Sequence, residues 1–258
     1  MKAIILAAGS GQRLLPYTES VPKCMVEIAG RSLLQHQIDV MRSVGVEDIT
    51  VITGYRADQI QIDSINKLHN AAYATTNMVS TLFIAREIIS SGEDVIVAYA
   101  DIVYQKDVFE RLVKCDAPIC LPVDLDWEQL WSARMPNPLE DAETLKMNQS
   151  GDILELGKKP KDRSEIQAQY IGLIKFRSDL ACQLPDFYEA MDKSATFDGK
   201  DFSNMYMTSF LQMLIDGNWQ AKSIQIKNGW IEVDTTENFD LYNKMHQNGT
   251  LSKFIKLN

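Results

Sequence analysis

The first 25 residues constrain the fold more than any other stretch of the chain. Residues 3–8 form an apolar run, which predicts a buried parallel strand. The run leads into a glycine-rich turn at residues 9–11, followed by Arg13 and Lys23. Glycine lets a backbone approach a polyanion closely, and successive N–H groups then bind its oxygens. Basic side chains nearby supply the fixed charge that phosphate groups need. The stretch therefore predicts a nucleotide site.

Two common phosphate-binding loops do not fit this turn. A dinucleotide fold needs G-x-G-x-x-G, but the position of the third glycine is occupied by Leu14. The G-x-x-x-x-G-K-[ST] pattern of a P-loop is absent from the sequence. The turn thus indicates another class of nucleotide site, and the alternative is an ordinary strand–turn–helix with two stray basic residues.

The turn resembles the signature of the sugar-phosphate nucleotidyltransferase superfamily, which is L-A-A-G-x-G-x-R, a short loop and then P-K. Every position of that signature is occupied, at Leu6, Ala7, Ala8, Gly9, Gly11, Arg13, Pro22 and Lys23. The resemblance implies an α/β, Rossmann-like nucleotidyltransferase fold. Such a fold has a mostly parallel central sheet, helices on both faces and a small mixed acceptor-binding lobe.

The spacing of apolar residues supports this class of fold. It predicts helices over residues 32–41, 80–89 and 106–115, and strands over residues 49–53, 94–101 and 118–123. This alternation predicts a mostly parallel sheet with helices on both faces and ligands at the carboxyl ends of its strands. The second half predicts a hairpin turning at 148–151, strands at 169–176 and 230–234, and helices at 207–215 and 237–247.

The length of 258 residues is enough for one large domain or two small ones. No repeat, low-complexity tract or linker divides the chain, so we expect a single nucleotidyltransferase domain over residues 1–258. Within it we expect a nucleotide-binding core at 1–123 and an acceptor-binding region at 124–180. The remainder, 181–258, contributes a second metal-binding aspartate.

The net charge of −9 argues against a nucleic-acid partner, which would favour a basic face. An anionic nucleotide would instead be bound locally by the basic residues near the N-terminus and a divalent cation. The early apolar run is too short for a signal sequence or a membrane span, so we expect a cytoplasmic protein with no membrane partner.

The cysteines and histidines are scattered without metal-ligand spacing, which argues against zinc and against Ser-His-Asp chemistry. We expect the cysteines to be reduced, buried thiols, at Cys24, Cys115, Cys120 and Cys182. Cys24 adjoins Lys23, which could lower its pKa, but a packed small side chain is the favoured interpretation.

Two aspartates are candidate ligands of Mg²⁺. Asp101 ends an apolar strand and Asp234 ends the segment Ile-Glu-Val-Asp, and the resemblance places metal ligands at these positions. Mg²⁺ is commonly held by one or two carboxylates together with phosphate oxygens. The alternatives are a strand-end or helix-capping aspartate at each position, and Glu232 is a second-choice ligand.

The resemblance implies in-line attack of an acceptor phosphate or phosphonate on the α-phosphorus, with pyrophosphate leaving. Catalysis would then be positioning and charge stabilisation, with Lys23 at the α-phosphate and Arg13 at the β- and γ-phosphates. We assign nucleotide binding to Leu6, Ala7, Ala8, Gly9, Ser10, Gly11, Gln12, Arg13, Lys23, Thr76, Asn77, Ser80, Tyr99 and Ala100. CTP as the nucleotide is implied by the resemblance, and no physical feature of the sequence excludes UTP.

The middle of the chain resembles small-molecule cytidylyltransferases. The similarity lies in the run T-N-M-V-S-T-L at 76–82, in residues 124–143, in G-K-K-P at 157–160 and in Q-Y-I-G at 169–172. It is greatest to 2-aminoethylphosphonate cytidylyltransferases, with phosphocholine and phosphoglutamine enzymes as the alternatives. Candidate acceptor-binding residues are Asp126, Trp131, Asp141, Lys159 and Tyr170.

The acceptor assignment has structural alternatives. Trp127 and Trp131 lie at i, i+4, a spacing that also suits helix packing, and Lys159 also fits a solvated turn. A phosphonate would need a cation such as Lys159, while an ammonium group would need carboxylates or aromatic faces.

Two further functions fit parts of the sequence. A sugar-1-phosphate nucleotidyltransferase is disfavoured by the Trp-rich segment, and a non-catalytic nucleotide sensor by the presence of the arginine, the lysine and both aspartates. Mg²⁺-dependent pyrophosphate release separates these classes. The segment 205–207 and the last helix support either a homodimer or core packing.

Overall fold

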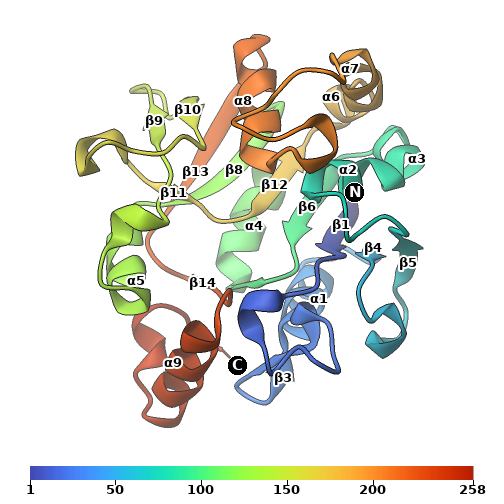
Figure 1. Cartoon of the computed structure of the whole chain (residues 1–258). Helices are drawn as coiled ribbons and strands as arrows, with labels where there is room; N and C mark the ends of the chain where they lie inside the picture. Colours follow the sequence, from blue (N-terminus) through green and yellow to red (C-terminus); the bar gives the residue numbers. More distant parts are fainter. Residues whose placement is uncertain (258) are drawn as a thin grey trace.

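The computed structural model describes residues 1–257 and is built around one eight-stranded sheet (Figure 1). Its strands are β1 (Lys2–Ala7), β4 (Asp48–Thr53), β5 (Asn66–His69), β6 (Val95–Tyr99), β8 (Ile119–Asp124), β11 (Gln169–Tyr170), β12 (Leu173–Phe176) and β13 (Ala221–Ile226). The order is β11-β8-β12-β6-β1-β4-β5, and β13 also pairs with β8. The pairs among β6, β1, β4 and β5 are parallel, whereas β12 is antiparallel to both β6 and β8. The predicted α/β class with a mostly parallel sheet is confirmed.

Three small antiparallel pairs flank the main sheet. They are β2 (Glu27–Ile28) with β3 (Arg31–Ser32), β7 (Ile102–Tyr104) with β14 (Trp230–Glu232), and β9 (Leu145–Met147) with β10 (Ile153–Leu156). The last pair is the predicted hairpin, and its turn is closed by a hydrogen bond from the N–H of Gly151 to the carbonyl of Asn148. The pair β7–β14 is the one that bears on the site described below.

Helices cover both faces of the sheet (Figure 1). They are α1 (Leu33–Ser43), α2 (Met78–Leu82), α3 (Arg86–Ile89), α4 (Lys106–Lys114), α5 (Trp127–Arg134), α6 (Ser178–Ala181), α7 (Leu184–Ala190), α8 (Met207–Asp216) and α9 (Thr236–Gln247). Short 3₁₀ helices are η1 (Gln12–Leu14), η2 (Lys23–Met25), η3 (Ala57–Gln59), η4 (Phe83–Ala85), η5 (Pro138–Glu140), η6 (Arg163–Glu165), η7 (Phe202–Asn204) and η8 (Leu251–Lys253).

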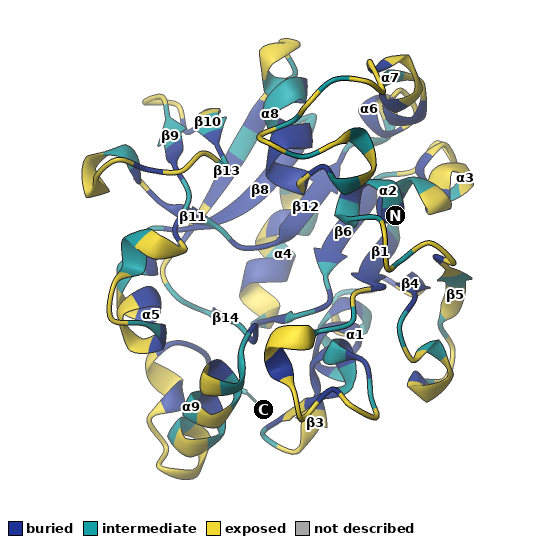
Figure 2. Ribbon diagram, in the orientation of Figure 1, coloured by how far each residue is buried: buried dark blue, intermediate teal, exposed yellow. Residues whose placement is uncertain are grey.

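The alternation of side chains along β1 explains why the strand is apolar throughout. Ala3 and Ile5 pack into an apolar cluster with α1, α4, α5 and α9. Ile4 and Leu6 point the other way, into a second cluster with α2, α3, α6, α7 and α8. Because neighbouring side chains of a strand face opposite sides of the sheet, a strand covered on both faces is buried continuously. Figure 2 shows the buried sheet between helices whose outer surfaces are exposed.

Two predicted elements are interrupted in the structure. The helix expected over 80–89 is broken into α2, η4 and α3, and the ring of Phe83 stacks on Tyr188 at the break, with centroids 4.0 Å apart. The strand expected over 169–176 is divided into β11 and β12 because Gly172 has a φ of +81°. A Cβ at Gly172 would lie 2.8 Å from the ring of Tyr99, so this position between β11 and β12 requires glycine.

The expectation of four reduced, buried cysteines is wrong in part. Cys115 and Cys120 form a disulfide, since the short connection from α4 to β8 brings their side chains together. Cys182 is free but exposed, and Cys24 is free and buried as expected. Cys24 does not have a lowered pKa: burial raises the pKa of its thiol to about 12.

The segment 205–207 contributes to the core of this chain. Met205 and Met207 are buried, and Tyr206 between them is exposed. Of the two interpretations given for this segment, core packing therefore describes both methionines. Within residues 1–257, no helix is long and apolar enough to cross a membrane.

Candidate active site

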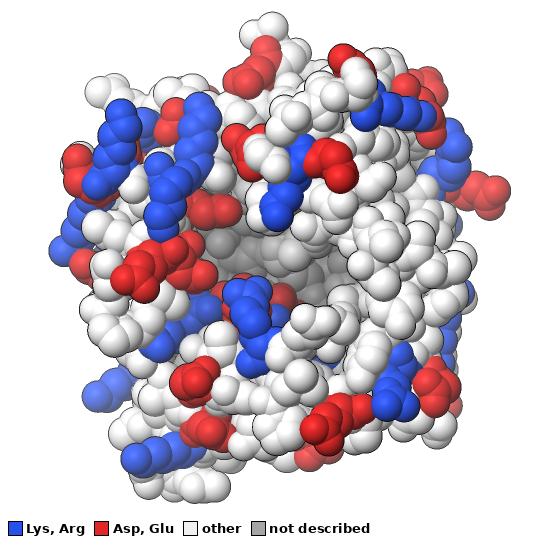
Figure 3. All heavy atoms as spheres, viewed as in Figure 1, with Lys and Arg blue, Asp and Glu red and all other residues white. Residues whose placement is uncertain are grey.

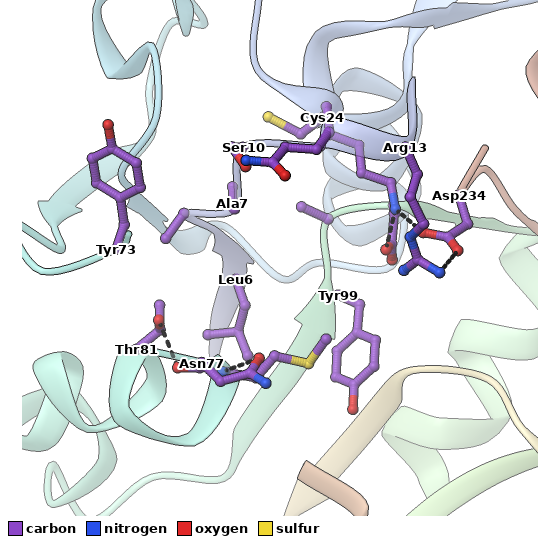
Figure 4. Close-up of a pocket in the computed structure, with 18 of the residues that line it drawn as sticks. Leu6, Ala7, Ser10, Arg13, Cys24, Tyr73, Asn77, Thr81, Tyr99 and Asp234 are labelled. Atoms are coloured by element: carbon purple, nitrogen blue, oxygen red, sulfur yellow. Dashed lines mark hydrogen bonds and ion pairs between the residues drawn. The ribbon is translucent and has the colours of Figure 1, made fainter. Parts of the chain in front are cut away.

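A cavity of about 400 Å³ lies where β1 and β6 end, beside the glycine-rich turn (Figure 4). The predicted crevice at the carboxyl ends of parallel strands is thus present. Figure 3 shows the hollow near the centre of the view, with acidic and basic side chains on its rim. In the close-up, Arg13 and Asp234 lie at one side of the cavity and Tyr73 lies at the other.

The turn that forms one wall depends on Gly11. This residue has a φ of +63° and precedes η1, and a Cβ there would lie 2.9 Å from the Cβ of Lys23. The hydroxyl of Thr18 donates a hydrogen bond to the carbonyl of Gly11 at 2.9 Å and holds the turn in place. The absence of a side chain at Gly11 therefore lets Lys23 lie directly against the loop.

Four charged side chains meet at one end of the cavity, and we call Arg13, Lys23, Asp101 and Asp234 the Lys23 cluster. The Nζ of Lys23 lies 2.8 Å from Oδ2 of Asp101 and 2.8 Å from Oδ1 of Asp234. Nη1 of Arg13 lies 2.6 Å from Oδ2 of Asp234. Burial lowers the pKa of Lys23, but the charges of Asp101 and Asp234 outweigh it, so the pKa is raised. Lys23 is therefore a cation.

Pairing between β7 and β14 brings the two aspartates together. Asp101 lies in the turn between β6 and β7, and Asp234 follows β14. The N–H of Val233 donates to the carbonyl of Asp101 at 2.9 Å, which extends the ladder to this point. The helix-capping alternative for Asp234 is wrong, because the cap of α9 is Thr235, whose hydroxyl accepts from the N–H of Asn238.

The two aspartates could hold a divalent cation. Oδ1 of Asp101 is buried and has no hydrogen-bond partner among residues 1–257, so this atom is free to bind a ligand. Within the described part of the chain, no group of three or more His, Cys, Asp or Glu side chains forms a protein-only metal cage. Two carboxylates beside a phosphate site nevertheless suit Mg²⁺, which takes further oxygens from phosphate and water.

Thirteen of the fourteen residues that we assigned to nucleotide binding line this cavity: Leu6, Ala7, Ala8, Gly9, Ser10, Gly11, Gln12, Arg13, Lys23, Thr76, Asn77, Tyr99 and Ala100. Ser80 does not, because it lies on the other side of α2, where its hydroxyl donates to the carbonyl of Ser203 at 2.9 Å. Which of these residues touch a nucleotide stays a prediction.

The cavity has further lining residues that the sequence reasoning missed. Met78 and Thr81 lie within the T-N-M-V-S-T-L run, so the run itself was a signal for them. Cys24 follows the signature lysine directly. Tyr73 lies in a turn after β5, and no periodicity or motif marks it.

The residues assigned to the acceptor do not line this cavity. Trp131 is 4% exposed, and its indole N–H donates to Oδ2 of Asp141 at 3.0 Å. The Nζ of Lys159 donates to the main-chain carbonyls of Leu139 and Glu140, both at 2.6 Å. Trp131 is therefore part of the core, and the ammonium of Lys159 stabilises the turn at residues 139–140.

Of the five acceptor candidates, Tyr170 has an aromatic contact with a residue that lines the cavity. Its ring meets the edge of Tyr99, a lining residue, at a centroid distance of 5.9 Å. Asp126 stands at the start of α5, and its N–H donates to Asp124. Nearby Glu143, which the sequence reasoning did not single out, has a pKa raised to about 7 by burial and then by neighbouring carboxylates, of which Asp141 is the largest contributor.

The fold and the cavity are those of a nucleotidyltransferase, and comparison with known proteins agrees. Residues 3–153 match the family model of the MobA-like NTP transferase domain. The chain is 44% identical over 244 residues to the CTP:phosphoglutamine cytidylyltransferase of Campylobacter jejuni, covering 91% of this chain and 96% of that one. The chain therefore belongs to the MobA-like NTP transferase family.

Two further similarities are informative. The 2-aminoethylphosphonate cytidylyltransferase of Lancefieldella rimae is 26% identical over 113 residues, which are 42% of this chain and 46% of that one. The structure of a CTP:phosphocholine cytidylyltransferase from Streptococcus pneumoniae aligns with a TM-score of 0.73 at 20% identity. That alignment covers 95% of this chain and 98% of the other, so the two share their fold along the whole length.

Proposed function

We propose that the protein transfers CMP from CTP to a small phosphorylated acceptor and releases pyrophosphate. The observation that carries the proposal is the Lys23 cluster, where two cations and two carboxylates meet beside a glycine turn at the end of β1. The arrangement supplies positive charge for phosphates and carboxylates for Mg²⁺ within one cavity.

Phosphoglutamine is the acceptor that we propose first. The relative that uses it matches this chain at 44% identity over nearly the full length of both proteins. The match to the 2-aminoethylphosphonate enzyme is lower and covers less than half of either chain. Our first expectation from the sequence, 2-aminoethylphosphonate, is therefore less well supported than its alternative.

The exposure of the two basic residues suggests how they divide the phosphates. The side chain of Lys23 is 16% exposed and lies deep in the cavity, whereas that of Arg13 is 70% exposed at its mouth. Lys23 suits the α-phosphate, where the reaction takes place, and Arg13 suits the outer β- and γ-phosphates. The N–H groups of residues 9–11 would bind the remaining phosphate oxygens.

Asp101 and Asp234 are the residues that would hold Mg²⁺, and the unpartnered Oδ1 of Asp101 fits that role. When bound, the ion would neutralise phosphate charge near the α-phosphorus. Binding of the nucleotide would also give Lys23 and Arg13 new partners in place of these carboxylates. The opposite side of the cavity, with Tyr73 and Thr81, would hold the cytosine base.

The reaction itself needs no nucleophile from the protein. An acceptor phosphate oxygen attacks the α-phosphorus, a new P–O bond forms, and the bond to pyrophosphate breaks. That oxygen already carries negative charge, so no general base is required. Cys24 lines the cavity, but its pKa of about 12 keeps the thiol protonated and unreactive. The chain's residues therefore contribute orientation and charge stabilisation.

Tyr170 against Tyr99 supports an acceptor entering from the side of α5 and β11. Asp126, Asp141 and Glu143 on that side would attract the ammonium group of an amino-acid acceptor. The indole N–H of Trp131 is already donated to Asp141, and the ammonium of Lys159 already donates to two main-chain carbonyls, so both are weaker candidates.

The test is Mg²⁺-dependent pyrophosphate release with CTP and, in parallel, phosphoglutamine, 2-aminoethylphosphonate, phosphocholine and glucose 1-phosphate. We expect the largest kcat/KM with phosphoglutamine. A larger kcat/KM with another of these acceptors would change the assigned acceptor but leave the proposed reaction unchanged. Equal use of UTP would contradict the cytidylyl assignment. Binding of CTP without turnover of any acceptor, in folded protein, would favour the nucleotide-sensor alternative.

A further inference from the structure

A buried ion pair lies behind the Lys23 cluster. Nη2 of Arg134, at the end of α5, lies 2.7 Å from Oε2 of Glu232, at the end of β14. The side chain of Arg134 is 1% exposed and that of Glu232 is 25% exposed. The guanidinium also lies 5.0 Å from the ring centroid of Trp131. The pair thus joins the helix of the acceptor side to the strand that leads into Asp234.

Glu232 is a close neighbour of the cluster. It pairs with Ile102 in the β7–β14 ladder, next to Asp101, and it precedes Asp234, which lies just beyond the end of β14, by two positions. The N–H of Val233, which lies between Glu232 and Asp234, donates to the carbonyl of Asp101 at 2.9 Å. The environment of Glu232 therefore includes the site itself.

The ion pair between Arg134 and Glu232 affects the net charge beside the cavity. The Lys23 cluster contains two cations and two carboxylates. An unpaired Glu232 would add a third carboxylate, which would repel a nucleotide and compete for Lys23. Arg134 supplies the matching third cation from outside the cavity.

We propose that Arg134 is a positioning residue of the nucleotide site: by holding Glu232, it offsets a third negative charge and leaves Lys23 free to bind nucleotide phosphates. The inference rests on the proposed function, because it assumes that the cavity binds a nucleotide.

The contacts of Arg134 distinguish it from a cation that only joins segments of the fold. Its Nε and Nη1 are buried and without a hydrogen-bond partner in the part of the chain that is described. Lys175, a buried cation at the other end of the sheet, donates to the main-chain carbonyls of Val113 and Cys115 as well as to Asp94. Arg134 has no such main-chain bond within residues 1–257, so its contribution is concentrated on Glu232.

The experiment measures CTP affinity by titration calorimetry in EDTA, which avoids any dependence on metal or turnover. Arg134→Met should weaken CTP binding by about tenfold, since one uncompensated charge near the phosphates corresponds to about 1.4 kcal/mol or more. The double variant Arg134→Met/Glu232→Gln removes both charges and should recover affinity to within about threefold of the wild type. Arg134→Lys, which keeps the charge, should also remain close to the wild type.

Lys175→Met is the matched control, because it removes a cation that is 4% exposed from a carboxylate that is 25% exposed, remote from the cavity. It should lower thermal stability and leave CTP affinity unchanged. If Arg134→Met does not fold, the double variant and Arg134→Lys decide, since loss of CTP binding in both would overturn the inference.

Three results would contradict the proposal. Wild-type affinity in Arg134→Met would show that the pair has no effect on the site. An equal loss in Arg134→Met and in the double variant would assign the effect to packing instead of charge. Failure of the wild-type protein to bind CTP both in EDTA and with Mg²⁺ would overturn the proposed function itself, and this outcome is distinct from the other two.

Discussion

The two ends of strand β6 carry similar ion pairs with different surroundings. At the amino end, Asp94 pairs with Lys175 at 3.0 Å, and at the carboxyl end, Asp101 pairs with Lys23 at 2.8 Å. Lys175 also donates to two main-chain carbonyls, at 3.0 and 2.7 Å. Within residues 1–257, the hydrogen bonds of the Lys23 ammonium go to carboxylates alone. At the amino end of β6 the lysine is held by main-chain carbonyls, whereas at the carboxyl end its ammonium donates only to side-chain carboxylates within residues 1–257, which a ligand could replace.

This difference distinguishes a lysine held by the backbone from the lysine that we propose binds phosphate. The partners of Lys175 are fixed by the fold, so its charge serves to hold α4, β6 and β12 together. The partners of Lys23 are side-chain carboxylates, which in the proposed function a phosphate and a cation would replace. Burial of a lysine therefore does not indicate its role, whereas the chemical nature of its partners does.

The largest effect should come from Lys23→Ala. We expect kcat/KM to fall by about 10²- to 10³-fold, because the variant removes a positive charge that stabilises the transition state. The melting temperature should stay within a few degrees of the wild type. Steady-state pyrophosphate release and thermal unfolding check these expectations, and near-normal turnover would show that Lys23 is not at the reacting phosphate.

The second effect should come from Lys175→Met at the other end of β6. Breaking this buried pair leaves Asp94 without its cation, and we expect a loss of about 3 kcal/mol in the free energy of unfolding. The kcat of the folded protein should be unchanged. Urea unfolding together with pyrophosphate release tests both parts. A change in kcat as large as that of Lys23→Ala would abolish the distinction between the two lysines.

The third comparison concerns the aspartates. Asp101→Asn keeps the shape of the side chain but removes a charge that would hold Mg²⁺, so we expect kcat to fall by about 100-fold, or about 2.7 kcal/mol. The half-saturating Mg²⁺ concentration should rise. Asp94→Asn, the matched variant at the amino end, should leave the Mg²⁺ requirement unchanged. If both variants had the same Mg²⁺ dependence, Asp101 would not be a ligand of the metal.

The smallest effect concerns Glu143, a half-buried carboxylate that forms no salt bridge within residues 1–257. Its pKa rises from 4.5 to about 7 on folding. Below pH 4.5 the group is protonated in both states, but above pH 7 the folded state must hold a buried charge, so stability falls as pH rises between these values.

Glu143→Gln should remove this loss. Allowing for partial exposure, the wild-type free energy of unfolding should fall by about 2 kcal/mol more than that of the variant between pH 4.5 and pH 8. Urea unfolding at the two pH values measures it. Parallel pH profiles would show that Glu143 titrates normally.

The strand-end geometry of the site was predictable, because it depends on local order. Residues 6–13 form a strand and turn in succession, and a parallel sheet collects its strand ends at one edge. The broken strand at Gly172 also had a signal, since an isolated glycine inside a strand pattern indicates a bend or a close approach.

Other features were not predictable because they arise from tertiary packing. The bond between Arg134 and Glu232 joins residues 98 positions apart, and no spacing rule relates them. Tyr73 reaches the cavity through an irregular turn after β5. Trp131 fitted both an acceptor pocket and a core, and only its neighbours distinguish the two. The parts played by individual residues in binding stay predictions.

The pairing of β7 with β14 also determines when the site forms. Lys23 and Asp101 belong to the first half of the chain, whereas Asp234 lies 211 residues beyond Lys23. Contacts between such distant segments form slowly, and a chain under synthesis exposes its N-terminal part first. A partly synthesised chain can thus pair β1, β4, β5 and β6 before Asp234 is present to complete the Lys23 cluster. Recovery of turnover after dilution from denaturant should lag behind recovery of sheet structure, so activity reports that the last segment has docked.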